Sequence, residues 1–253
     1  MNTLKRLGRR AALPFRRRFR SSMENPNEPL SLDMGGDSRT LLVAFGGMAG
    51  QLGMPPFEFF KATGEIPVKR LFVRDLHQAW YHRGIPGHGD TLEGAAASLR
   101  ALIDRHDVQR LVVAGNSAGG YASLAFGTLL RADTALSFAP QTVLDPAVLA
   151  EWDDHRWDGQ LDDLVREGAI DQRWSDLRDA LAGDGERRGG GTRYEVYFDE
   201  TLEVDRLHAD RIGDVPGVHL HRLSAGEHSV AQAMRDTGEL GRVLRAALLD
   251  PAD

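Results

Sequence analysis

The chain has 253 residues, 42% of them hydrophobic, a formal net charge of −6 and no cysteine. This length and composition suit one globular α/β domain with a sizeable core. The missing cysteine excludes disulfides, thiolate metal ligands and a cysteine nucleophile, and no apolar run is long enough to span a bilayer.

The N-terminal segment is strongly basic. Met1 to Arg20 carries one lysine and seven arginines but no acidic residue. Pro14 and Phe15 interrupt the place where an apolar signal core would lie, so no secretory signal is expected. We expect this arm to contact an anionic membrane or an acidic protein, with a solvated tail as the alternative. The expected location is cytoplasmic, with peripheral attachment at the inner face of the membrane as an option if the arm binds lipid.

Six segments bounded by polar or turn-forming residues predict strands, and the apolar run Thr40–Phe45 predicts a buried one. A linker is expected over Ser21 to Leu32 and no strand before Asp37, which divides the chain into an arm and linker, 1–32, and a domain, 33–253. Asp90 is expected to open a helix, with Glu93 as its capping-box partner, and another apolar stripe predicts the last helix. The predicted strands are Thr40–Phe45, Val68–Val73, Arg110–Ala114, Ala135–Phe138, Tyr194–Phe198 and Val218–Leu223.

The alternation of strands and helices predicts an α/β fold with a mostly parallel, doubly wound sheet. Ligands of such sheets bind at the carboxyl ends of the strands. The segment 142–191 departs from the alternation, since it is acidic and contains three tryptophans. It predicts short helices, at Leu161 to Arg166 and Trp174 to Leu181, that form a cap over the site. A surface excursion anchored by its tryptophans is the alternative.

The pentapeptide Gly115-Asn116-Ser117-Ala118-Gly119 joins a predicted strand to a predicted helix. In this context G-x-S-x-G predicts a nucleophile elbow, a strained turn that exposes the serine hydroxyl. The residues two before and two after the serine nearly touch in such a turn, so both must be small. Ser117 is therefore the candidate nucleophile, and a glycine-rich turn with an incidental serine is the alternative.

A serine hydroxyl needs a base, and the base needs an orienting acid. His228 follows the last strand and precedes the last helix, which is the place for the base in a serine, acid, histidine order. Two aspartates follow the preceding strand, and both remain candidates for the acid. Asp199 is alternatively a turn former, and Asp205, which is slightly preferred, is alternatively a helix N-cap. Glu200 and Glu203 are further options.

The loop after the first strand, Phe45-Gly46-Gly47-Met48-Ala49-Gly50, is rich in small residues. It predicts an oxyanion hole made by the N–H of Ala118 with that of Gly47 or Met48. A phosphate-binding loop is excluded because no Gly-Lys-Ser/Thr follows and Phe45 stands where a dinucleotide motif has glycine. We expect no cofactor, and the absence of metal-ligand spacing predicts no metal.

Together these residues resemble the α/β-hydrolase superfamily from about Asp37 to Leu249. Three stretches also resemble a bacterial group of small hydrolases often associated with cell-surface glycan or glycosyltransferase systems. They are Phe45-Gly46-Gly47 with Met54-Pro55-Pro56-Phe57-Glu58-Phe59, Arg74-Asp75 with Ala79-Trp80-Tyr81, and Asp205-Arg206-Leu207-His208-Ala209. The chain departs from the superfamily pattern because its first strands are expected to be missing. Its Phe198-Asp199-Glu200-Thr201 also replaces the usual Gly-x-x-Asp turn.

We therefore expect a serine hydrolase that cleaves a carboxylic ester or thioester through an acyl-enzyme intermediate. If the cap excludes water and admits an alcohol, the same groups predict an acyltransferase. A non-catalytic binding or scaffold protein is the alternative from another class. The expected partner is a small-molecule or glycan acyl ester, and not nucleic acid.

Overall fold

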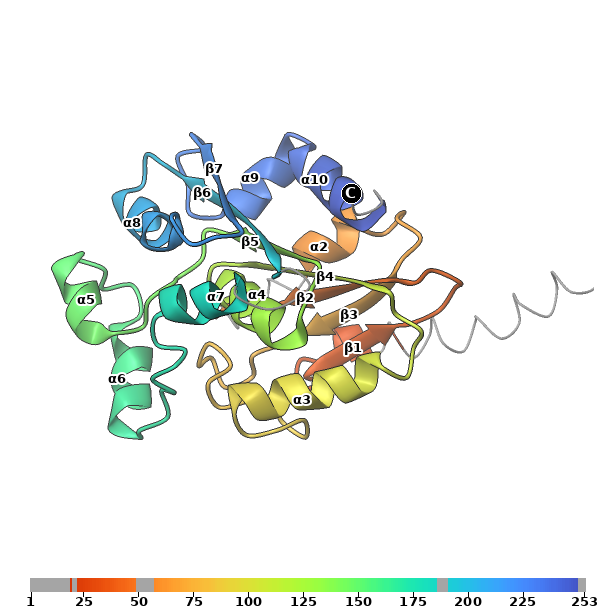
Figure 1. Ribbon diagram of the computed structural model, residues 1–253, viewed down its shortest axis with the longest axis horizontal. Coiled ribbons are helices and arrows are strands. Elements are labelled where there is room, and N and C mark those ends of the chain that lie inside the picture. Colours follow the sequence, from red (N-terminus) through yellow and green to blue (C-terminus); the bar gives the residue numbers. More distant parts are fainter. Residues whose placement is uncertain (1–18, 20–21, 49–56, 186–190, 250–253) are drawn as a thin grey trace, which may run out of the picture.

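A seven-stranded sheet in the order β1-β3-β2-β4-β5-β6-β7 forms the centre of the molecule (Figure 1). The computed structural model describes Phe19 and residues 22–48, 57–185 and 191–249. All six predicted strands form, within two residues of their predicted ends. They are β2 (Thr40–Phe45), β3 (Lys69–Val73), β4 (Arg110–Asn116), β5 (Thr134–Phe138), β6 (Arg193–Asp199) and β7 (Val218–Leu223), each parallel to its neighbours among them.

An additional strand, β1 (Leu30–Asp33), pairs antiparallel with β3 at one edge of the sheet. The prediction that no strand precedes Asp37 is therefore wrong, and the predicted linker runs into the sheet. Phe19 is also buried, with its ring 5.9 Å from that of Phe60 and 6.1 Å from that of Phe72. The rest of the basic arm lies outside the described residues.

Helices cover both faces of the sheet because successive strand residues point to opposite sides. Leu41, Val43 and Phe45 of β2 join one apolar core, while Leu42 and Ala44 join the other. The first core lies under α3 (Leu92–Ile103), α4 (Ala118–Leu130), α7 (Leu177–Gly185) and α8 (Glu203–Ile212). The second lies under α2 (Phe57–Ala62), α9 (Val230–Asp236) and α10 (Glu239–Leu249), grouped near the C-terminus in Figure 1. In the described part of the chain, no helix has the length and apolar character needed to cross a membrane.

The helix predicted to open at Asp90, α3, begins one residue later than predicted. Its N-cap is Thr91, which has extended backbone angles and accepts a hydrogen bond from the Gly94 N–H at 3.1 Å. Glu93 is not a capping-box partner. It accepts hydrogen bonds from Arg173 and from the Trp174 indole, both at 2.6 Å, and so ties the segment after α6 to the body.

The segment 142–191, which the sequence predicts to be a cap, divides into two parts. Its helices α5 (Pro146–Glu151) and α6 (Asp158–Arg166) stand out at one side of the molecule (Figure 1). The third helix, predicted from Trp174, begins at Leu177 and packs on α4 as part of the body, with Leu177 and Leu181 fully buried. We therefore keep the name cap for residues 142–176.

Candidate active site

Ser117 lies in a strained turn between β4 and α4. Its backbone angles are φ 57° and ψ −120°, and its N–H donates to the Phe138 carbonyl at 2.8 Å. A Cβ on Gly115 would lie 1.9 Å from the Gly119 carbonyl oxygen, and one on Gly119 would lie 2.4 Å from that of Phe45. Only glycine fits at these two positions, and the close approach lets α4 begin directly after the serine.

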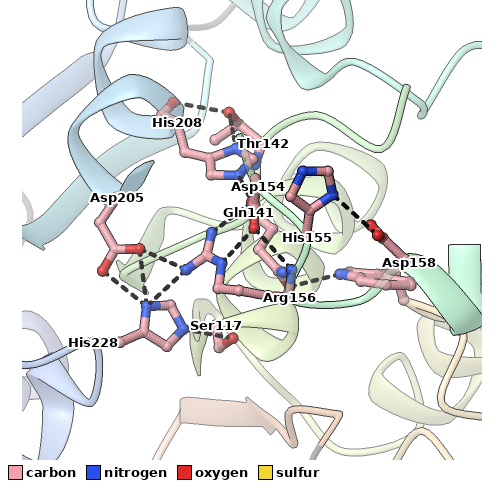
Figure 2. Close-up of polar contacts among 11 residues, drawn as sticks. Ser117, Gln141, Thr142, Asp154, His155, Arg156, Asp158, Asp205, His208 and His228 are labelled. Atoms are coloured by element: carbon pink, nitrogen blue, oxygen red, sulfur yellow. Dashed lines mark hydrogen bonds and ion pairs between the residues drawn. The ribbon is translucent and has the colours of Figure 1, made fainter. Parts of the chain in front are cut away.

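His228, on the loop after β7, lies beside Ser117 (Figure 2). It follows β7, and its Nε2 lies 2.9 Å from Ser117 Oγ. Its Nδ1 lies 2.8 Å and 2.9 Å from the two carboxylate oxygens of Asp205. Asp205 is in the first turn of α8 but is not its N-cap, which is Leu202, and its side chain is only 3% exposed. The structure thus brings Ser117, His228 and Asp205 into one hydrogen-bonded row.

Asp199, the other candidate acid, lies at the end of β6 and serves the loop instead. Its carboxylate accepts from the Thr201 N–H and hydroxyl at 2.8 Å and 2.6 Å, and from the backbone N–H groups of Gly226 and Glu227. Burial disfavours ionisation, but these hydrogen bonds hold the pKa of Asp199 below its ordinary value. Asp199 therefore fixes the two residues before His228 and makes no recorded contact with the imidazole.

The glycine loop after β2 lies against the turn that holds Ser117. The Gly46 N–H donates to the Val73 carbonyl at 2.9 Å, and a Cβ on Gly47 would lie 3.2 Å from the Asn116 carbonyl. Met48 is buried, and Ala118 is the first residue of α4. The first N–H groups of a helix have no partner within it, so that of Ala118 is free to serve a ligand. Gly47 thus lies against the turn that holds Ser117 and Ala118, while Ala49 and Gly50 lie outside the described residues.

The buried carboxylate of Asp75 supports this loop through Tyr81. Asp75 accepts from the N–H groups of Ala79 and Tyr81 at 2.7 Å and 3.0 Å, and burial raises its pKa. The Tyr81 hydroxyl in turn donates to the carbonyls of Gly46 and Val73. The stretch that the sequence associates with a family resemblance is therefore a brace for the candidate oxyanion loop.

Arg156 contacts the candidate site, and sequence reasoning did not identify it. It lies in the cap between α5 and α6, and its guanidinium holds Asp154 with two hydrogen bonds of 2.7 Å and 2.8 Å. Its Nη1 donates to Asp205 at 2.8 Å and lies 3.3 Å from His228 Nδ1 (Figure 2). An arginine in an acidic, tryptophan-containing insertion gives no sequence signal for this role, because the contact depends on how the cap folds back.

His208 anchors the far end of the same network. Its Nδ1 accepts from the Thr142 N–H at 3.0 Å, so its Nε2 carries the proton and donates to Asp154 at 3.1 Å. Burial lowers the pKa of His208, which keeps the ring neutral, and the Trp152 ring packs edge-on against it. The cap is therefore joined to α8 by hydrogen bonds that end at the candidate acid.

Three solved enzymes illustrate the fold that this geometry belongs to. Carboxylesterase CesB from Bacillus subtilis aligns at a TM-score of 0.53 and 13% identity, over 95% of this chain and 99% of its own. Est1E from Butyrivibrio proteoclasticus aligns at 0.55 and 15%, over 86% and 93% of the two chains. MenH from S. aureus aligns at 0.53 and 13%, over 87% and 97%.

These likenesses, with the mostly parallel sheet and its flanking helices, show that the chain has the α/β-hydrolase fold. The sequence identities are low, so the likeness extends to the fold and not to an activity. No family model matches the sequence, and no curated protein matches it.

Proposed function

We propose that the protein is a serine hydrolase that cleaves a carboxylic ester or thioester. The observation that carries the proposal is the row formed by Ser117 Oγ, His228 and Asp205, with heavy-atom distances of 2.9 Å and 2.8 Å. A nucleophile within hydrogen-bond reach of a base, and a base oriented by a carboxylate, is the arrangement that activates a serine.

In the first half-reaction, Ser117 Oγ attacks the acyl carbon while His228 Nε2 takes the hydroxyl proton. Asp205 accepts the hydrogen bond of His228 Nδ1–H, which fixes the ring and stabilises its protonated form. The tetrahedral intermediate collapses, the imidazolium protonates the leaving alcohol or thiol, and an acyl-serine remains. Water then attacks with His228 as its base, and the acid and the free serine are released.

The oxyanion of each tetrahedral intermediate needs donors that are already in place. The Ala118 N–H and the N–H of Gly47 or Met48 are the proposed pair. Support comes from the close contact of Gly47 with the turn that holds Ser117, and from the brace that Asp75 and Tyr81 provide. Preformed donors of this kind contribute on the order of 10²–10³ in turnover for each one removed.

An active-site probe tests the proposal directly. A fluorophosphonate should label the wild-type protein and hydrolysis of an activated ester should be measurable, while Ser117→Ala should lose both and keep its melting temperature. Ser224→Ala is the matched control, because Ser224 precedes His228 on the same loop and only approaches Glu200 at 3.4 Å. An unlabelled wild type would instead support a binding protein. Faster release of a new ester on adding an alcohol would support acyl transfer.

A further inference from the structure

The cap places a positive charge beside the acid and base of the proposed triad. Arg156 Nη1 donates to Asp205 Oδ1 at 2.8 Å, and His228 Nδ1 lies 2.9 Å from the same oxygen. The guanidinium and the imidazole therefore share one carboxylate oxygen, and their nitrogens are 3.3 Å apart. The Arg156 side chain is 29% exposed, so solvent screens its charge only in part.

Asp154 holds the guanidinium of Arg156 in this position. Asp154 binds it in the two-pronged geometry that suits arginine and not lysine. Burial opposes ionisation of Asp154, but hydrogen bonds from Arg156 and His208 keep its pKa well below the ordinary value. Burial likewise opposes the charge of Arg156, yet Asp154 and Asp205 raise its pKa. Both groups are thus charged throughout the range in which an ester can be assayed.

We infer that Arg156 is a positioning residue, which holds the Asp205 carboxylate in place for His228 and sets a positive charge beside the imidazole. This inference rests on the proposed function. The hydrogen bond of Arg156 to Asp205 fixes the acceptor that orients the ring, and Arg156 Nη1 lies 3.3 Å from His228 Nδ1. Removal of this charge is therefore expected to change the pH dependence of activity.

The remaining groups around His228 do not replace this charge. Asp205 faces it from α8 and Ser117 from the turn before α4. Glu227 is its neighbour on the loop, where the carboxylate of Asp199 holds the Glu227 N–H at 3.3 Å. Among the described residues, Arg156 is thus the cation that contacts the His228 ring.

The test is the pH dependence of kcat/KM for an activated ester. Arg156→Met should move the midpoint of the acidic limb upward by about one pH unit, because a like charge within 4–6 Å shifts a titration by roughly that much or more. It should also lower kcat about tenfold, through loss of one charge-assisted hydrogen bond to Asp205. Arg156→Lys keeps the charge and should restore the midpoint while kcat stays reduced.

Arg173→Met is the matched control. Arg173 also ties this segment to the body, through Glu93 of α3, and pairs with Asp171 beside it, but its side chain is 72% exposed and, among the described residues, contacts no member of the row. If Arg156 had a merely structural role, Arg156→Met would behave like Arg173→Met. Its melting temperature would fall or its KM would rise, and the acidic limb of the pH profile would not move. If Arg156→Met does not fold, Arg156→Gln removes the same charge. An unmoved limb in the neutral variant, or an equal shift in Arg173→Met, would overturn the inference.

A second readout separates this inference from the proposed function. The imidazole of His228 can be titrated by NMR, with its signal assigned by loss in His228→Asn. Its midpoint should rise by about one unit in Arg156→Met whether or not the protein turns over an ester. A wild type without turnover or probe labelling would refute the proposed function, and the difference in NMR midpoint between wild type and Arg156→Met would then decide whether the charge of Arg156 acts on the imidazole.

Discussion

Two isosteric substitutions distinguish the acid of the row from the carboxylate that supports it. Asp205→Asn and Asp199→Asn each exchange one oxygen for an amide nitrogen in a buried side chain. In Asp205→Asn the charge that stabilises protonated His228 is lost, and the amide can hold the ring in the wrong tautomer. The equivalent change in a serine protease costs on the order of 10⁴ in turnover, and we expect a loss of that size here.

The structure predicts a different outcome for Asp199→Asn. The carboxylate accepts four hydrogen bonds, two from Thr201 and one each from the N–H groups of Gly226 and Glu227. An amide keeps one oxygen and turns its nitrogen toward N–H or O–H donors, so about two of these bonds are lost. Each hydrogen bond to a charged group contributes about 1.5 kcal/mol or more, which gives a loss of about 3 kcal/mol in the free energy of unfolding. For a chain of this size that corresponds to roughly 10 °C in melting temperature.

The assay is therefore a pair of measurements on each variant: turnover of an activated ester at pH 7 and 25 °C, and the melting temperature by circular dichroism. Asp205→Asn should lose turnover and melt within a few degrees of wild type, while Asp199→Asn should melt early and keep turnover within about tenfold. If Asp199→Asn lost turnover by 10³ or more at an unchanged melting temperature, Asp199 would be the acid. If neither variant lost even tenfold, the row would not be the catalytic one.

Three further outcomes are expected. Gly115→Ala should destabilise the protein by more than about 3 kcal/mol and abolish turnover, because the new Cβ would lie 1.9 Å from a carbonyl oxygen. Gly159→Ala is the control and should change stability by less than about 1 kcal/mol, since its Cβ would meet open space. Urea unfolding of the two variants measures the difference. Burial lowers the pKa of His82 to about 4 in the folded protein. As the pH falls below about 6.5, His82 is therefore protonated in the unfolded chain before it is protonated in the folded protein, and this favours unfolding. Stability should therefore fall by about 2 kcal/mol between pH 7 and 5, and a His82→Gln variant with an equally steep pH dependence would contradict this. Deleting residues 1–18 should leave turnover unchanged and weaken salt-sensitive binding to anionic vesicles, at about 1 kcal/mol per basic residue; equal co-sedimentation of the two forms at low salt would argue against a membrane role.

The sequence by itself determined six of the seven strands that the structure describes and two members of the row. Each buried strand is a run of apolar, often β-branched residues, so local composition predicts it without knowledge of its neighbours. Ser117 and His228 were identifiable for the same reason, since the first lies in a strand-turn-helix with small flanking residues and the second follows the last strand. β1 gave no such signal, because a four-residue edge strand of sequence LSLD is stabilised by pairing with β3 and not by its own pattern.

Only the tertiary structure shows that Asp205, and not Asp199, contacts His228, and it alone reveals the contact of Arg156. Asp199 ends β6 and Asp205 follows it by six residues, so the difference depends on where the first turn of α8 lies relative to the loop after β7. The contact of Arg156 with Asp205 spans 49 residues of sequence and requires the residues between α5 and α6 to lie against α8. Contacts of that kind arise from packing between distant segments, and their energies are properties of the folded neighbourhood that no local pattern records.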